Sequence, residues 1–338
     1  MTCGQNGSSR IDLLDWLKGC AIIAVVLDHL KIVPGLYVMW SVNLFVLITA
    51  FIYSKTGYDF SYKKLVLKIF QVLYLTVSAV FLIGGLNTLF NIQNPQPIFS
   101  VFLRPYSFLV YNRYLGDIWY IALHLQFLVF FCLYLKCQKF LKVKPVIAAA
   151  VILNILSLVL THIAFKRFHT ILFSSWLVFL AAGFYGMRPN LKLIGDFPHS
   201  RLLGTALGFA LVIFLYRLYP LFPWLFTNKN RVTFLNLPFY CALVLFLVEL
   251  FHVLSAFQAG RILKSLIYLP GRHSLAIFLT NEPFGFRWRM VFSNSALVAV
   301  LSILSGIAFG IAADKLFLHL RGFLSNRKKI NAPPLIQT

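Results

Sequence analysis

The first apolar segment of the chain carries two ionisable residues whose types and spacing suit acid–base chemistry. Its sequence, RIDLLDWLKGCAIIAVVLDHL, places Lys18 and His29 eleven residues apart. In an α-helix eleven residues turn through about 1100°, so both side chains lie on one face, about 16 Å apart along the axis. A lysine can hold an anionic group such as a phosphate, and a histidine can accept a proton near neutral pH. The spacing therefore predicts a site that holds a long anionic molecule at Lys18 and reacts near His29.

Two simpler interpretations of this pair stay open on the sequence alone. Lys18 can extend its ammonium group to the lipid headgroups, and His29 can be an interfacial histidine bonded to a neighbouring helix. Asp28 adjoins His29 but points about 100° away around the helix, so it either orients the imidazole or faces another helix. Because an ionisable residue inside a membrane helix costs roughly 2.5–3.5 kcal/mol by insertion scales, each of these residues is a functional candidate.

Four further ionisable residues are weaker candidates. Lys64 and Lys68 lie one turn apart near the start of an apolar segment, where they either hold a substrate phosphate or extend to the headgroups. Glu249 and His252 are three residues apart, so their side chains can touch on one helix face. They form either a buried structural pair or a catalytic one.

Aromatic and polar residues near the ends of two other segments could line a cavity. Trp119 and Tyr120 follow Asp117 where one segment begins, and aromatic residues at that depth also form interface belts. Asn281 and Glu282 lie near the outer end of a later segment. Their predicted depth in the membrane is similar to that of His29, so the three residues could line one cavity.

Composition indicates what kind of protein positions these residues. The 338-residue chain is 60% hydrophobic and 12% charged, with a mean hydropathy of +0.82. A soluble protein carries about 25% charged residues. The apolar runs are continuous and about twenty residues long, as spanning helices require, and they lack the alternation of a membrane barrel. We predict an all-α polytopic integral membrane protein with about ten transmembrane helices in one domain, residues 1–338.

The predicted helices cover most of the chain. They are expected at 14–33, 36–54, 65–90, 117–136, 145–165, 170–187, 202–220, 233–257, 272–286 and 294–318. Short cytoplasmic tails are expected at about 1–13 and 320–338. The ninth helix ends in Asn281-Glu282-Pro283, which suggests a broken or re-entrant helix. Ten polar residues precede the first apolar run, unlike in a signal peptide, so the first helix is expected to be permanent.

Charge and motif content disfavour several function classes. The net charge of +22 comes from basic residues spread over short loops, a pattern that favours contact with membrane lipids over nucleic acid. Some of the cytoplasmic ones could also hold a phosphorylated substrate. The chain has no GxSxG, HExxH, GxxxxGK[ST] or CxxC motif. Its five cysteines have no metal-ligand spacing, so no metal site is predicted.

The order of residues in the first segment resembles the membrane acyltransferase family 3, and more narrowly its fucose 4-O-acetylase-like branch. Members open with a basic residue, an aspartate, a Lys-Gly pair, an apolar run and a histidine. The matching residues here are Arg10, Asp15, Lys18-Gly19, AIIAVVL and His29. Many relatives have arginine where this chain has Lys18.

Four later segments are similar to further family landmarks in the same order. They are LFVLITAFIYS (44–54), YKKLVLKIFQVLY (62–74), DIWYIALHLQF (117–127) and GRHSLAIFLTNEPF (271–284). The chain departs from the usual pattern at two of them. Thr49-Ala50 replaces a Ser-Gly pair, and Asn281 stands where a histidine often occurs.

The resemblance implies an O-acyltransferase of the bacterial inner membrane. The donor would be acyl-CoA, usually acetyl-CoA, and the acceptor a hydroxyl of an envelope carbohydrate or a lipid-linked glycan. His29 would be the catalytic base, with Asp28 beside it. Two sets of residues would contact the substrates: Lys18, Arg10, Lys64 and Lys68 at the acyl donor, and Trp119, Tyr120, Asn281, Glu282 and Glu249 along the acceptor site or cavity. No bound cofactor or metal is expected, because a thioester is already activated.

Two alternatives use the same residues differently. A transporter or flippase of a lipid-linked glycan would use the intramembrane polar groups as a substrate path and would not bind coenzyme A. A catalytically inactive family member that serves as a scaffold would tolerate the replacement of His29.

The basic residues also predict the orientation of the chain. With the N terminus in the cytoplasm and ten crossings, 21 of the 31 lysine and arginine residues face the cytoplasm, as the positive-inside rule favours. We therefore expect both termini in the cytoplasm. Reporter fusions at the two ends measure this directly, and a periplasm-active reporter at either terminus would overturn the arrangement.

Overall fold

The computed structural model describes a helical protein. The described residues are 8–33, 40–56, 62–89, 119–137, 140, 142–163, 173–186, 204, 206–211, 213–214 and 237–330, and every regular element within them is a helix. The first half contains α1 (Ser8–His29), α2 (Trp40–Thr56), α3 (Tyr62–Leu89), α6 (Trp119–Cys137) and α7 (Val143–Ile163). The second half contains η3 (Phe173–Trp176), α8 (Leu177–Ala181), η4 (Ala182–Gly186), α10 (Leu237–Ala256), α11 (Gln258–Arg272), α12 (Ser274–Val291) and α13 (Ser295–Ile330).

Several of these helices are apolar enough to cross a membrane. Within the described ranges, four are also long enough, over Leu65–Ile83, Tyr120–Cys137, Phe239–Ala256 and Ser295–Leu320. Shorter apolar stretches cover Trp40–Ser54, Val143–Ser157 and Ser174–Tyr185. Large apolar side chains are exposed on the outer faces of these helices, as a lipid-facing surface requires. The helical membrane class is therefore supported, and the count of ten spans stays a prediction.

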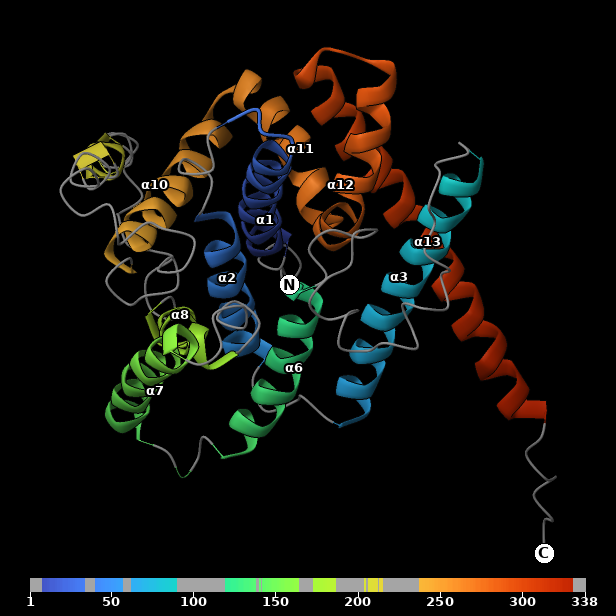
Figure 1. Ribbon diagram of the computed structural model, residues 1–338. Helices are drawn as coiled ribbons and strands as arrows, with labels where there is room; N and C mark the ends of the chain where they lie inside the picture. The colour runs from blue at the N-terminus through green and yellow to red at the C-terminus, as the bar shows by residue number, and fades with distance from the viewer. Residues whose placement is uncertain are drawn as a thin grey trace, which may run out of the picture.

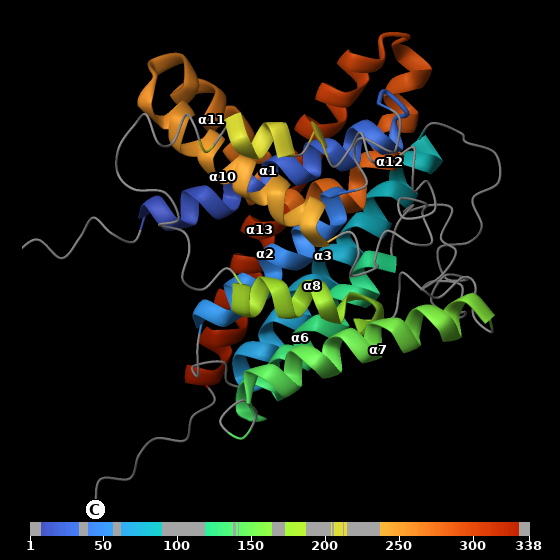
Figure 2. The ribbon, with the colours of Figure 1, turned by 90° about the vertical axis from the view of Figure 1, so that its left-hand side faces the viewer.

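Helix α1 lies at the centre of the bundle (Figure 1). It packs against α2, α10, α11, α12 and α13, and its residues Trp16, Leu17 and Ile22 are fully buried. Figures 1 and 2 show α11 and α12 on one side of α1, and α6, α7 and α8 on the opposite side. The helix that carries Lys18 and His29 is thus surrounded by protein along most of its length, which explains why it can hold ionisable residues.

Three predicted helix boundaries are wrong. Helix α1 begins at Ser8 rather than at 14 and ends at His29 rather than at 33. Helix α13 continues to Ile330 rather than ending at 318, so the tail expected from 320 is helical as far as 330. Hydropathy detects the apolar part of a helix, and both helices continue into polar sequence. Of the helix expected at 202–220, residues 204, 206–211 and 213–214 are described, and these are helical.

The expected break in the ninth helix is also wrong. Helix α12 continues through Pro283 to Val291. Side chains of the preceding turn bond to carbonyl groups near the proline: Thr280 Oγ1 donates to Ala276 O at 2.8 Å, and Asn281 Nδ2 donates to Phe278 O at 2.7 Å. Pro283 itself removes the donor for the carbonyl oxygen of Leu279, a loss that membrane helices tolerate.

One helix was not predicted at all. Helix α11 (Gln258–Arg272) lies, apart from its last residue, between the helices predicted at 233–257 and 272–286. Hydropathy does not detect it, because it is short and charged. Its apolar residues Ile262, Leu266 and Leu269 are exposed, as in a helix that lies along a membrane surface. Two glycines let its backbone approach α1 closely. A methyl group at Gly19 would overlap the carbonyl oxygen of Ile267, and one at Gly271 would overlap that of Asp15.

This close approach predicts a steric effect of a single methyl group. We expect Gly19→Ala to force α1 and α11 apart, because overpacking a close contact costs about 1–3 kcal/mol. Gly85→Ala is the matched control, since no atom lies within 4 Å of the added carbon at that position. Thermal unfolding in detergent measures both variants. Equal unfolding temperatures for the two would contradict the packing of α1 on α11.

Candidate functional site

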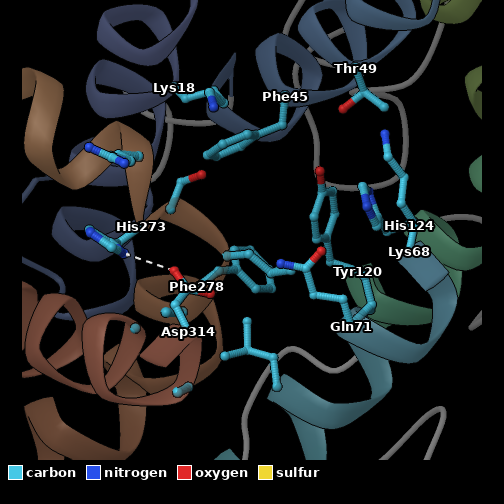
Figure 3. A pocket seen from close by; sticks show the side chains of 18 of the residues that line it. Lys18, Phe45, Thr49, Lys68, Gln71, Tyr120, His124, His273, Phe278 and Asp314 are labelled. Atoms are coloured by element: carbon cyan, nitrogen blue, oxygen red, sulfur yellow. Dashed lines mark ion pairs between the residues drawn. The ribbon is translucent and has the colours of Figure 1, made fainter. Parts of the chain in front are cut away.

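A cavity opens among seven helices at the Lys18 end of α1. Its volume is about 350 Å³, and residues from α1, α2, α3, α6, α11, α12 and α13 line it. Figure 3 shows Lys18, Thr49, Gln71, Tyr120 and Asp314 around this common space, each from a different helix. Small-molecule sites typically measure about 300–1,000 Å³, so the cavity could hold part of a long substrate.

The lining of the cavity is strongly basic. Three permanent cations, Lys18, Lys68 and Arg272, contribute to it, whereas Asp314 is the single carboxylate among the lining residues. Lys18 forms an ion pair with Asp15 one turn earlier on α1. The ammonium of Lys68 lies 5.0 Å from the centre of the Tyr53 ring, a distance typical of a cation–π contact. The cavity therefore favours an anionic ligand.

Asp314 has a local partner on the same wall. Its Oδ2 lies 3.9 Å from Nδ1 of His273, the residue between α11 and α12 (Figure 3). Burial lowers the pKa of His273 below its usual range, and the charge of Asp314 partly opposes this change.

Aromatic side chains form the opposite end of the cavity. The rings of Tyr120 and Phe278 have centroids 4.8 Å apart, and those of Phe45 and Tyr120 are 6.1 Å apart. The hydroxyl of Tyr120 forms a hydrogen bond with the side chain of Thr49. The Thr49 departure from the family pattern therefore lies on this aromatic wall, which the structure places at the edge of the cavity.

His29 is not among the residues that line the cavity, but it contacts one that is, Phe278. Its Nδ1 is 2.7 Å from Oδ1 of Asn281, a fully buried residue of α12. The ring of Phe278 meets the imidazole edge to face, with centroids 6.4 Å apart. Phe278 both lines the cavity and contacts His29, so a single aromatic ring connects the basic cavity with the candidate base.

The end of α1 holds His29 in place. Ile32 N donates to Leu27 O and Lys31 N donates to Asp28 O, which together form a Schellman motif. Lys31 takes the left-handed conformation that this motif needs, with φ of 53°. Asp28 pairs with Lys31 at 3.7 Å. The structure thus places the Asp28 carboxylate at the helix terminus.

The other predicted residues fall into three groups. Tyr120 and Lys68 line the cavity with Lys18, as described. Glu282 approaches His29, with 4.0 Å between Oε1 and Nδ1. Glu249 is buried in α10 and does not line the cavity.

Three predicted residues cannot be placed by their side chains. Arg10 lies in α1, Lys64 in α3 and Trp119 at the start of α6. Their side chains, and Asp117 as a whole, lie outside the described part of the chain.

Sequence reasoning missed four residues of the site. Arg272, His273 and Phe278 belong to the GRHSLAIFLTNEPF segment, in which the sequence pattern assigns roles only to Asn281 and Glu282. Asp314 lies on α13, and no local pattern relates it to His273. Only the packing of α12 against α13 brings these two residues together.

Comparison with known proteins identifies the family. The acyltransferase-3 family, described as an acyltransferase domain, matches residues 11–314. Neither curated proteins nor solved structures give a match. The matched range includes Lys18, His29, Asn281 and nearly all of the cavity lining. The chain therefore belongs to the acyltransferase-3 family of membrane proteins.

Proposed function

We propose that the protein is an O-acyltransferase that moves an acyl group, most simply acetyl, from acyl-CoA to a carbohydrate hydroxyl. The acceptor would be an envelope carbohydrate or a lipid-linked glycan at a bacterial inner membrane. Family membership supports acyl transfer in general. The similarity of the first helix to the fucose 4-O-acetylase-like branch supports acetyl as the group and a sugar hydroxyl as the acceptor.

One observation carries this proposal. The Phe278 ring lines the basic cavity and also contacts His29, and α1 is continuous from Lys18 to His29. The axial distance between the two residues is therefore about 16 Å. An extended acyl donor with phosphates at one end and a thioester at the other suits this arrangement.

The acyl donor would bind with its phosphates at the basic end. Lys18, Lys68 and Arg272 supply three cations there, and charge-assisted hydrogen bonds to phosphate are about twice as strong as neutral ones. Arg10 and Lys64 lie on the same helices as Lys18 and Lys68, so they would extend the basic region. The thioester end would then point along the cavity towards Phe278.

The reaction needs one proton acceptor. As the sugar hydroxyl oxygen bonds to the thioester carbon, its proton passes to His29, and the carbon–sulfur bond breaks. The coenzyme A thiolate leaves and takes up a proton, which His29 can return. Imidazole in model peptides titrates near pH 6.5, so it accepts a proton readily at neutral pH.

Replacing His29 tests the catalytic step. We expect His29→Ala to lower turnover by about a hundredfold to ten-thousandfold, the range that a general base supplies. His29→Gln should fail as well, because an amide forms hydrogen bonds but does not take the proton. Acyl transfer by purified protein in detergent measures this, with an acyl-CoA and candidate glycans as substrates.

The control for this experiment is another histidine. His319 is exposed on α13, and His319→Ala should retain turnover. Near-normal transfer by His29→Ala, at matched thermal stability, would remove His29 from the mechanism. Transport of a lipid-linked glycan without thioester consumption would instead favour a flippase.

Replacing Lys18 tests the donor end. We expect Lys18→Gln to weaken acyl-CoA binding by about tenfold to a hundredfold, because contacts with charged groups contribute about 1.5–3 kcal/mol. Lys18→Arg should retain most of the affinity, since the site requires a cation. Lys144→Gln, an exposed position on α7, is the control for lost charge. Unchanged acyl-CoA affinity in Lys18→Gln would show that Lys18 serves only the membrane surface.

A further inference from the structure

We infer that Asn281 is a positioning residue that fixes the tautomer of His29, with the proton on Nδ1 and the lone pair on Nε2. The catalytic meaning of this inference rests on the proposed function. The tautomer itself follows from the hydrogen bonds around Asn281 and can be measured without any reaction. With this tautomer, Nε2 is the atom that would take the proton of the acceptor hydroxyl.

The first step is the orientation of the Asn281 amide. Asn281 is fully buried, and one end of its amide lies 2.7 Å from the carbonyl oxygen of Phe278. A carbonyl oxygen only accepts hydrogen bonds, so the NH₂ group must be at that end. The flipped amide would place two oxygen atoms against each other in a buried site, which is costly. The amide oxygen therefore points away from Phe278.

The second step is the partner of that oxygen. Oδ1 of Asn281 lies 2.7 Å from Nδ1 of His29. An amide oxygen carries lone pairs and no hydrogen, so Nδ1 must be the donor in this bond. A neutral imidazole has one N–H group. With that hydrogen on Nδ1, Nε2 carries the lone pair that a general base needs.

The third step is the rigidity of the arrangement. Asn281 lies one turn after Phe278 on α12, and the Phe278 ring packs against the same imidazole. Arg289, also on α12, donates a hydrogen bond to the carbonyl oxygen of Leu30, next to His29. Helix α12 thus fixes the ring, its Nδ1 partner and the end of α1 together. A hydrogen bond at one ring nitrogen commonly sets which nitrogen of a histidine reacts.

Charged groups near His29 act differently from Asn281. Glu282 is 4.0 Å from Nδ1, beyond hydrogen-bond distance. Asp28 and Lys31 pair with each other on α1, and Arg289 bonds to the Leu30 carbonyl. These groups influence how readily the imidazole gains a second proton. The short hydrogen bond to Asn281 decides which ring nitrogen carries the single hydrogen of the neutral imidazole.

The direct test is the tautomer of His29 in the whole protein. Nitrogen-15 NMR of histidine-labelled protein in detergent distinguishes N–H from unprotonated ring nitrogens, and comparison with His29→Gln identifies the signals of His29. We expect Nδ1 to carry the hydrogen in the wild type at a pH above the titration of the ring. In Asn281→Leu, which has a similar shape and no acceptor oxygen, we expect both tautomers. A wild-type proton on Nε2 would overturn the inference.

Kinetics supply the second readout. We expect Asn281→Leu to lower kcat by about tenfold to a hundredfold, part of the contribution of a general base, with an unchanged KM for acyl-CoA. Asn281→Asp keeps an oxygen beside Nδ1, so it should restore both the Nδ1–H tautomer and part of kcat. A kcat within twofold of wild type in Asn281→Leu would overturn the positioning role.

A matched control separates positioning from general destabilisation. Asn154 is also fully buried, and its Nδ2 donates to the carbonyl oxygen of Ser175 at 2.6 Å. It lies on α7, away from α12, so Asn154→Leu should affect stability without changing the His29 tautomer or kcat. If His29→Ala keeps full turnover, the catalytic role proposed for His29 fails, and the wild-type NMR spectrum still decides the tautomer.

Discussion

A polar group inside hydrocarbon must find its partner within the protein, and this constraint organises the structure. Helix α1 carries ionisable residues along its length, and it packs at the centre of the bundle against α2, α10, α11, α12 and α13. Each of its polar side chains in the site has a partner within reach: Asp15 for Lys18, Lys31 for Asp28 and Asn281 for His29. The apolar faces of the outer helices remain exposed to the bilayer. The bundle therefore holds these polar groups at its central helix and turns apolar side chains outward.

The same constraint explains why α11 packs as it does. A helix with three basic residues cannot lie deep in the bilayer, yet its glycine lets it approach the backbone of α1 closely. Small residues at such contacts are common where membrane helices meet, because close backbones gain dispersion contacts. Arg272, the last residue of α11, lines the cavity. Close packing at Gly271 thus places the Arg272 guanidinium at the cavity.

Sequence reasoning predicted those parts of the fold and site that depend on one segment at a time. A long apolar run identifies a helix, and an eleven-residue spacing places Lys18 and His29 on one face. Similar predicted depths related His29 to Asn281. Reasoning of this kind could not find α11, whose stability comes from its contact with α1 rather than from hydropathy. It also could not relate Arg272 and Asp314 to Lys18, because only tertiary packing brings them together.

The continuity of α1 has a further consequence for how the chain can evolve. Lys18 and His29 belong to one continuous helix. The distance between them is therefore set by the number of residues that separate them. Inserting or deleting one residue between them would move His29 by about 1.5 Å along the axis and rotate it by about 100°. It would then face away from Asn281 and Phe278. Between Lys18 and His29, substitutions can be accepted within the limits of packing. Insertions and deletions cannot, because they change the number of residues.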